Sequence, residues 1–336
     1  MLDTVKALIF QIGILFLMMV PGIILKKAKL VGDSFGKGLS AFVLYIAQPA
    51  LVFLAYLQPY DPSVLNGILW VLLFSVIAHA LFAVVAILIF RRAKPDKQKV
   101  LRMVTIFSND AFMGIPLIDV LMGGTAMLYA TIYNITFNLV LWSLGVYLCT
   151  HDHDANGDGV QSREEKRAIR RNTLRTFSFA FVHPVTIAAF LGLIFFFLPI
   201  HTYVPDLITD GFAMLKATVA PLSMVVIGLR LASTSFRGLF RDGHMYLFLA
   251  LRHFLLPGIM LLLLRAGHAV FPSIDMTVMK VVLILAAAPA ASSATMFAER
   301  FGCDAAYAGK LVTVSTILSI VSMPLLLLLL GIGLPA

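Results

Sequence analysis

Two segments of the chain place polar residues and prolines where the surrounding sequence is almost wholly apolar. Residues 100–122 contain the string SNDAFMGIPLIDV, and residues 277–299 contain LAAAPAASSATMF. A proline within a helix removes a backbone donor and clashes with the preceding turn, so each helix should break near its centre. Inside a membrane, broken backbone is tolerated only where protein or a cavity surrounds it. The two segments therefore predict a site formed by two interrupted helices.

The half-helices on either side of each break indicate what this site would bind. Those that follow the breaks would point their amino ends at the membrane centre, and free N–H groups there favour an anion. The carbonyl oxygens of the preceding half-helices would suit a coupling cation or polarised water. Neutral side chains would add hydrogen bonds to a carboxylate. The candidate substrate-binding residues in these segments are Asn109, Asp110, Gly114, Pro116, Pro289, Ser292, Ser293 and Thr295.

Two acidic residues of the first segment are candidates for ion coupling, because charged groups at membrane depth are costly and usually functional. Asp110 is the better proton carrier because it adjoins Asn109, although it could instead cap the following turn. Asp119 lies close to the predicted outer end of its helix and could simply reach water. We expect three other polar residues to snorkel or to face a cavity between domains. These are Lys216, Arg252 and His253.

The composition shows which elements must position these residues. Of 336 residues, 60% are hydrophobic and only 13% charged, with a mean hydropathy of +0.95, which excludes a soluble protein. We predict an all-α polytopic membrane protein, because each apolar run is close to the roughly 20 residues that cross a bilayer. The ten predicted spans are 6–25, 38–58, 64–90, 100–122, 126–149, 176–199, 207–232, 245–266, 277–299 and 307–331.

The formal charge of +9 predicts the orientation of these spans. Alternate loops hold 21 of the 26 Lys and Arg residues, so the positive-inside rule places those loops in the cytoplasm and both termini outside. We expect a multi-pass protein of the plasma or inner membrane. A nucleic-acid partner is not expected, since no basic surface studded with aromatic residues is present.

The polar stretch 151–175 divides the chain into two halves of five spans, and an odd number per half gives the halves opposite orientations. Pro49 and Pro221 are 172 residues apart, and Pro116 and Pro289 are 173 apart. The near-equal offsets favour two inverted five-helix repeats, an architecture typical of transporters. Spans 100–122 and 277–299 would be the broken helices of the two repeats.

The chain resembles the auxin efflux carrier family, whose distant relatives are the bile acid sodium symporters. Four strings carry the resemblance, SNDAFMGIPL, APLSMVVIGLRLA, APAASSATMFAERFG and STILSIVSMP. The resemblance implies a homodimer and an elevator mechanism, in which a transport domain moves against a scaffold. It also implies that the broken helices of spans 100–122 and 277–299 cross where they unwind. The implied boundaries are 1–62 and 176–243 for the scaffold, 63–150 and 244–336 for the transport domain, and 151–175 for a cytoplasmic loop.

The resemblance also assigns individual residues. The family's binding asparagine falls on Asn109 and a crossover proline on Pro116, while Ala294 stands where plant members carry a second crossover proline. Asn134 and Asn138 in span 126–149 fall where a polar side chain faces the site in relatives, and Asn134 matches better.

The central loop contains DANGDGVQSREE, which fits the calcium-loop pattern D-x-[DN]-x-[DN]-G-x5-E. The predicted calcium ligands are Asp154, Asn156, Asp158, the Val160 carbonyl, Ser162 and Glu165. A solvated turn made of ordinary turn formers is the alternative, because no second loop is present to pair with this one. The basic run after it, 163–175, would lie on anionic membrane lipid.

We therefore predict a secondary active or facilitative carrier of a small organic anion, such as a mono- or dicarboxylate or an auxin-like weak acid. No required cofactor is expected, and Na⁺ or H⁺ could be the coupling ion. The alternatives are an intramembrane enzyme and a calcium-responsive membrane sensor. No phosphate loop of the form G-x-x-x-x-G-K-[ST] is present, which excludes ATP-driven pumping by this chain alone. Asp110 and Asp119 are nine residues apart, too far along a helix for a dyad on one turn, so we expect no enzyme.

Overall fold

The computed structural model describes residues 10, 12–150, 181–198 and 203–329. Within these ranges the chain is helical, and its one β contact is an isolated antiparallel bridge between Ser108 and Ala290. The α-helices are α2 (Met19–Lys27), α3 (Asp33–Phe42), α4 (Gln48–Tyr56), α5 (Pro62–Ile89), α6 (Pro95–Ile106), α7 (Ile115–Leu121), α8 (Gly124–Val140), α9 (Val146–Thr150), α11 (Pro184–Phe197), α12 (Asp206–Ser233), α13 (Gly243–Ala250), α14 (Leu256–Val270), α15 (Met276–Ala287), α16 (Ser292–Arg300) and α17 (Ala305–Leu329).

Six helical stretches in the described ranges are long and apolar enough to cross a membrane, so the protein is a multi-pass membrane protein. Three of them are joined through one turn of π-helix. The six are Asp33–Tyr56, Pro62–Arg92, Gly124–Thr150, Asp206–Ser233, Gly243–Val270 and Ala305–Leu328.

The predicted spans 100–122 and 277–299 are not among the six, because the chain leaves helical geometry inside both of them. The first is divided into α6 and α7, which are joined by a non-helical turn at 107–109 and a π-helical turn over Asp110–Gly114. The second is divided into α15 and α16 by residues 288–291. Each half is too short to span a bilayer by itself.

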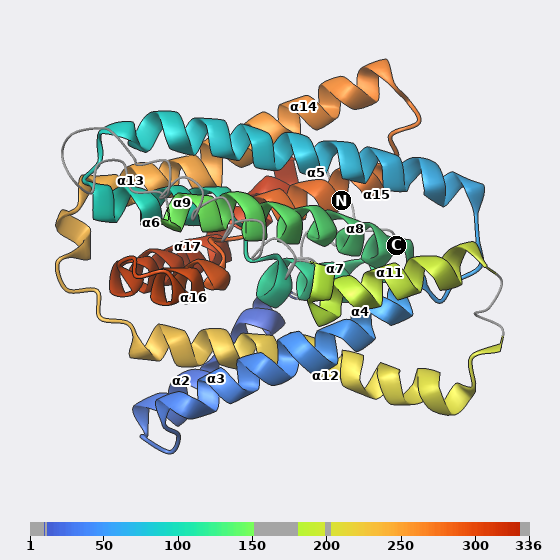
Figure 1. The fold of residues 1–336 in the computed structure, drawn as a ribbon, viewed down its shortest axis with the longest axis horizontal. Helices are drawn as coiled ribbons and strands as arrows, with labels where there is room; N and C mark the ends of the chain where they lie inside the picture. The colour runs from blue at the N-terminus through green and yellow to red at the C-terminus, as the bar shows by residue number, and fades with distance from the viewer. Residues whose placement is uncertain (1–9, 11, 151–180, 199–202, 330–336) are drawn as a thin grey trace, which may run out of the picture.

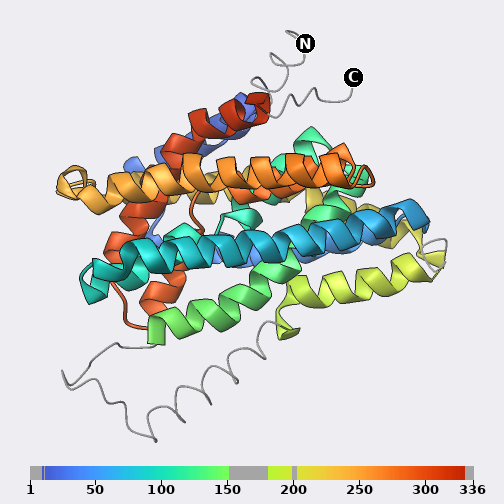
Figure 2. The same cartoon turned by 90° about the horizontal axis from the view of Figure 1, so that it is seen from above.

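The helices form two groups (Figure 1). The α12 group contains α2, α3, α4, α11 and α12, in which α12 packs on α2 and α4, and α11 packs on α4. We call the remaining helices the crossing group, because they include the two broken helices that cross each other. In this group α5 lies beside α14 along the outer side (Figure 2). The two broken helices belong to the crossing group.

Two glycines bring α2 and α12 into the closest helix contact of the α12 group. A Cβ on Gly228 would lie 2.1 Å from the Met19 carbonyl oxygen, and a Cβ on Gly22 would lie 2.2 Å from the Val225 carbonyl oxygen. Because backbone atoms face each other at both points, neither helix has a flexible side chain that could move aside. This contact fixes α2 on α12.

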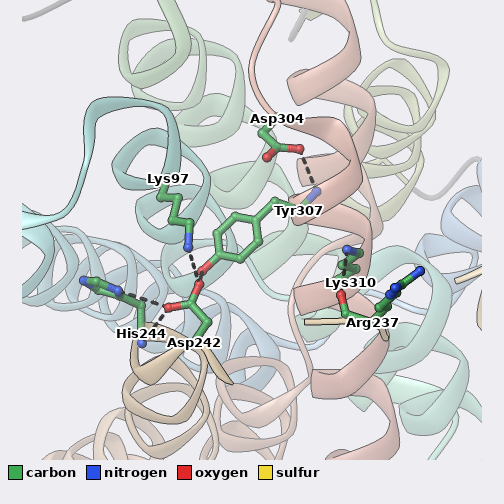
Figure 3. Close-up of polar contacts among 7 residues, drawn as sticks. All are labelled: Lys97, Arg237, Asp242, His244, Asp304, Tyr307 and Lys310. Atoms are coloured by element: carbon green, nitrogen blue, oxygen red, sulfur yellow. Dashed lines mark hydrogen bonds and ion pairs between the residues drawn. The ribbon is translucent and has the colours of Figure 1, made fainter. Parts of the chain in front are cut away.

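A polar cluster ties together the ends of three crossing-group helices, α6, α13 and α17 (Figure 3). The Asp242 carboxylate accepts hydrogen bonds from Lys97 Nζ at 2.6 Å and from the Tyr307 hydroxyl at 2.9 Å. The backbone N–H of His244 donates to it at 3.1 Å, so Asp242 also caps α13. Partial burial alone would raise the pKa of Asp242, but these hydrogen bonds outweigh it and lower the pKa to about 2.

We expect Asp242→Asn to lower the free energy of unfolding by about 1–2 kcal/mol at neutral pH, because the amide loses the charge that strengthens these bonds. The native carboxyl has a depressed pKa, so its contribution is complete above about pH 4 and is lost as the pH falls through about 2. Melting of wild type and variant in detergent should therefore differ at pH 7 and converge toward pH 2. Asp210→Asn, at an exposed position of α12, is the control and should leave melting unchanged at both pH values.

Candidate functional site

The two breaks lie against each other in antiparallel orientation and form what we call the crossing, residues 107–110 and 288–291. The Asn109 N–H donates to the Pro289 carbonyl at 2.7 Å, and the Ala291 N–H donates to the Phe107 carbonyl at 2.8 Å. These bonds satisfy backbone groups that a continuous helix would have paired internally. Two segments about 180 residues apart in the sequence are thus held in one backbone unit.

The crossing carries buried polar atoms that lack a protein partner. Asn109 is 2% exposed and Asp110 is fully buried. Within the described ranges, the Asn109 amide nitrogen and both Asp110 carboxyl oxygens have no hydrogen bond of ordinary length and angle. Buried polar groups are nearly always paired, and unpaired ones mark places where a ligand, ion or water completes the bonding. The geometry therefore supports a binding role for both residues.

The turn after Asp110 is tightly packed. The Asn109 carbonyl accepts hydrogen bonds from the N–H groups of Met113 and Gly114, at 3.1 and 3.0 Å, so the first turn after the break is π-helical. A Cβ on Gly114 would lie 2.7 Å from a Leu285 methyl, which explains a glycine where the two broken helices pack. Pro116 lies in the second helical turn after the break, where its missing N–H leaves a carbonyl of the π-helical turn without its helical partner.

The predicted residues after the second break occupy the first turn of α16. Ser292 is buried, and the Ser293 hydroxyl is a buried oxygen without a hydrogen-bond partner in the described ranges. Thr295 lies one turn further on and faces a cavity. The amino end of α16 carries no side-chain cap, so its free N–H groups remain available.

The two asparagines of α8 bond to each other. The Asn138 amide donates to the side-chain and backbone oxygens of Asn134, both at 2.9 Å, and both residues are buried. Phe137, the neighbour of Asn138, packs its ring against that of Phe107 in the crossing, with the ring centroids 5.8 Å apart. The structure thus places this part of α8 beside the crossing, with the Asn138 amide already engaged by Asn134.

Arg252 and His253 differ from the sequence expectation. Both are fully buried, and neither snorkels nor lines the cavity described below. They occupy the π-helical turn Leu251–Leu255, which joins α13 to α14, and both bond to groups that form or adjoin the crossing. The signal for this role was an Arg-His pair in the middle of an apolar span, where a charge is costly unless it has partners.

A cavity of about 950 Å³ lies between the two groups of helices, walled by α3 and α12 on one side and by α16 and α17 on the other. Of the predicted substrate-binding residues, Thr295 alone lines it. Asp33, Lys37 and Glu299 on its rim are exposed, so the rim reaches the surface. Five basic residues against two acidic ones give the cavity a net positive charge, which favours an anion. The basic residues are Lys26, Lys37, Arg230, Arg300 and Lys310.

Arg230 connects this cavity to the second break. It projects from α12, and its Nη1 donates to the Ser292 carbonyl at 3.2 Å. The guanidinium has five N–H donors in a planar fork, so a single carbonyl leaves others for a carboxylate. The sequence did not single out Arg230 as a site residue, because nothing in it shows that Arg230 reaches α16.

An ion pair joins the two groups in the amino-terminal half of α12. Lys216 Nζ lies 2.9 Å from an Asp119 carboxyl oxygen, with 35% and 19% of their side chains exposed. Asp119 belongs to α7, so this coupling candidate has a basic partner on the opposite group. Lys216 and Arg230 are fourteen residues apart, about 21 Å along α12. The groups are thus bridged by an ion pair at one end and separated by a cavity toward the other.

The central loop lies outside the described residues. The predicted calcium ligands, Asp154 to Glu165, therefore stay a prediction, as does the lipid-facing basic run that follows. In the part of the chain that the structure describes, no cluster of three or more acidic, His or Cys residues is arranged to hold a metal ion.

Comparison with known proteins agrees with a transporter. Residues 7–327 match the family model described as "Membrane transport protein". The chain is also similar to an uncharacterized transporter of Methanothermobacter thermautotrophicus, with 27% identity over 306 residues that cover 90% of this chain and 92% of the relative.

Proposed function

This chain belongs to the membrane transport protein family, the auxin efflux carrier family, and we propose that it is a secondary carrier of a small organic anion. Membership makes it a membrane transporter; the anionic substrate and the way it is moved are the proposal. Nothing in the described residues favours the alternative enzyme or sensor.

One observation carries the proposal: two broken helices are bonded to each other at a crossing that holds unpaired buried polar groups. The amino end of α16 has no side-chain cap, and the Asn109 amide nitrogen has no hydrogen-bond partner among the described residues. Donors in a poorly solvated place bind a carboxylate well, because its oxygens accept charge-assisted hydrogen bonds. The basic cavity that reaches Thr295 and Arg230 would be the route by which the anion arrives.

Alternating access is the mechanism we propose for it. The α12 group would be the scaffold and the crossing group the moving domain of a ten-helix, dimeric carrier, and each group would draw helices from both inverted repeats. The cavity would open to the cytoplasm, since it is lined by loop ends that are rich in Lys and Arg. The Asp119–Lys216 pair would close the opposite end in this state.

Asp110 is the proposed coupling group. It is buried at the crossing, and its carboxyl oxygens have no hydrogen-bond partner of ordinary geometry in the described ranges. A carboxylate in such a place is costly unless it is neutralised by a proton or a nearby cation. Taking up and releasing a proton there would couple anion movement to a pH gradient.

Uptake into vesicles tests the function. Purified protein in liposomes should accumulate at least one of labelled malonate, malate and indole acetate, saturably and under an imposed pH gradient. Asn109→Ala should reduce that uptake at least about ten-fold, since a hydrogen bond to a charged group is lost. Asn66→Ala, which removes an exposed amide bound to the Ser273 carbonyl, is the control. Failure of the purified protein to bind any of a broad anion panel would reject the proposal.

The alternating-access part has its own test. We expect Asp119→Lys to slow transport about five-fold, because it replaces a partly exposed attraction of about 1 kcal/mol by a repulsion. The double variant Asp119→Lys with Lys216→Asp should recover most of the wild-type rate. If the double variant is as slow as the single one, the ion pair does not set the balance between states.

A further inference from the structure

Arg252 lies at the centre of the crossing group with no exposed surface. Its Nε and Nη2 donate to the Ala288 carbonyl at 3.1 and 2.7 Å, and its Nη1 donates to the Thr105 carbonyl at 3.2 Å. The guanidinium carbon lies 5.2 Å from the centroid of the Phe82 ring. One side chain thus binds both broken helices.

The two carbonyls that Arg252 binds mark the carboxyl ends of the half-helices before the breaks. Thr105 lies in the last turn of α6, and Ala288 directly follows α15. In an unbroken helix the Thr105 carbonyl would accept from the Asn109 N–H, but that N–H donates to Pro289 instead. Carbonyls at such ends lack internal partners and carry the negative end of the helix dipole. They form the place where broken-helix carriers bind a coupling cation.

His253 holds the same turn in place from its other side. Its ring nitrogens lie 2.8 Å from the hydroxyls of Ser322 and Ser315, both on α17. The Ser315 hydroxyl also accepts a hydrogen bond from the Ala290 N–H at 2.9 Å. The π-helical turn 251–255 therefore contacts both a carbonyl and an N–H group of the second break. Arg252 binds the Ala288 carbonyl directly, and His253 reaches the Ala290 N–H through the Ser315 hydroxyl.

We infer that Arg252 is a resident cation, which takes the place between the carbonyl ends of α6 and α15 that a mobile Na⁺ would need. The inference builds on the proposed carrier function and names its coupling. A guanidinium bonded to both carbonyls fills the site permanently and keeps the two ends together. Anion transport by this chain therefore takes no Na⁺ at the crossing, and Arg252 acts there as a positioning residue.

The position of Asp110 agrees with Arg252 as the resident cation. Arg252 is an electrostatic neighbour of the Asp110 carboxylate, so the only charges at the crossing in the described residues are one fixed cation and one carboxylate. The guanidinium keeps its proton under all physiological conditions. The ion that comes and goes is then the proton of Asp110, while Arg252 stays in place through the cycle.

Melting of the purified protein in detergent tests the inference without any substrate, so the result does not depend on whether the proposed carrier function is right. Wild type should melt at the same temperature in NaCl and in choline chloride of equal concentration. Arg252→Ala should melt lower, and low millimolar guanidinium should raise its midpoint by about 1–3 °C, as expected for a ligand well above its dissociation constant. Wild type should show no such rise. The control is Arg265→Ala on the same span, which should not respond to guanidinium.

Two outcomes would overturn the inference. One is a saturable rise in the wild-type midpoint with millimolar Na⁺. The other is that guanidinium fails to raise the melting midpoint of Arg252→Ala, or raises it no more than choline does. If Arg252→Ala does not fold, the test rests on Arg252→Lys and on the wild-type Na⁺ titration. The lysine variant should remain folded, and Na⁺ should not change its melting midpoint. Where vesicle uptake is measurable, wild-type uptake should be equal with Na⁺ or choline outside.

Discussion

Arg230→Gln should raise the KM for the transported anion about 10- to 100-fold in vesicles while leaving the protein folded. The guanidinium is a cation that lines the cavity and bonds directly to the amino end of α16, at the Ser292 carbonyl. Glutamine keeps one amide donor but loses the charge and the fork, and a charge-assisted hydrogen bond contributes about 1.5–3 kcal/mol. The measurement is the concentration dependence of initial uptake.

Two further variants separate a specific contact from a general charge effect. Lys310→Gln removes a cavity charge whose ammonium donates, within the described residues, to the Arg237 carbonyl at 3.4 Å. It should change the KM less than about three-fold. Arg230→Lys should fall between wild type and Arg230→Gln, since a lysine keeps the charge without the planar fork. Equal effects of Arg230→Gln and Lys310→Gln would show that Arg230 contributes only to the general field.

Gly228→Ala should prevent proper assembly of the α12 group. The added methyl would lie 2.1 Å from the Met19 carbonyl oxygen, a distance at which one helix must move away from the other. Overpacking in a tight site typically costs about 1–3 kcal/mol, and this contact lies at or above the upper end because backbone faces backbone. We expect a large loss of monodisperse protein in size-exclusion chromatography and a clearly lower melting midpoint.

Gly211→Ala is the matched control, because it makes the same change on the same helix. A Cβ at Gly211 meets nothing within 4 Å, so the alanine should fit and even strengthen α12 by up to about 1 kcal/mol through its helix propensity. Gly22→Ala should behave like Gly228→Ala, since it meets the Val225 carbonyl oxygen from the opposite side of the contact. Normal assembly of Gly228→Ala would mean that α2 and α12 are not held at this distance in the folded protein.

Much of the helical content was predictable because it depends on local chemistry. Long apolar runs between charged loops predict membrane helices, and six of them are present as such in the described residues. The breaks at Asn109 and before Ser292 follow from polar residues, small residues and proline within those runs. These are properties of neighbouring residues, so a sequence carries them without knowledge of the fold.

The partners across the fold were not predictable. Arg252 binds Thr105, 147 residues away, and Arg230 binds Ser292, 62 residues away. The sequence suggested for Arg252 a snorkelling or cavity-facing cation, since a long basic side chain in an apolar span usually escapes to water. Its burial became possible only because two broken helices offer it carbonyls that have lost their own partners.

The sequence by itself determined that this chain is a multi-pass membrane protein with two interrupted helices, because hydropathy and proline act within a few residues of where they stand. Only the tertiary structure decided what meets at the interruptions. The Ser108–Ala290 bridge, the guanidinium between two carbonyl ends and the Asp119–Lys216 pair each join segments distant in the sequence. Such contacts depend on how the helices pack, because the bonds that stabilise them form between groups that have no partner within their own helix.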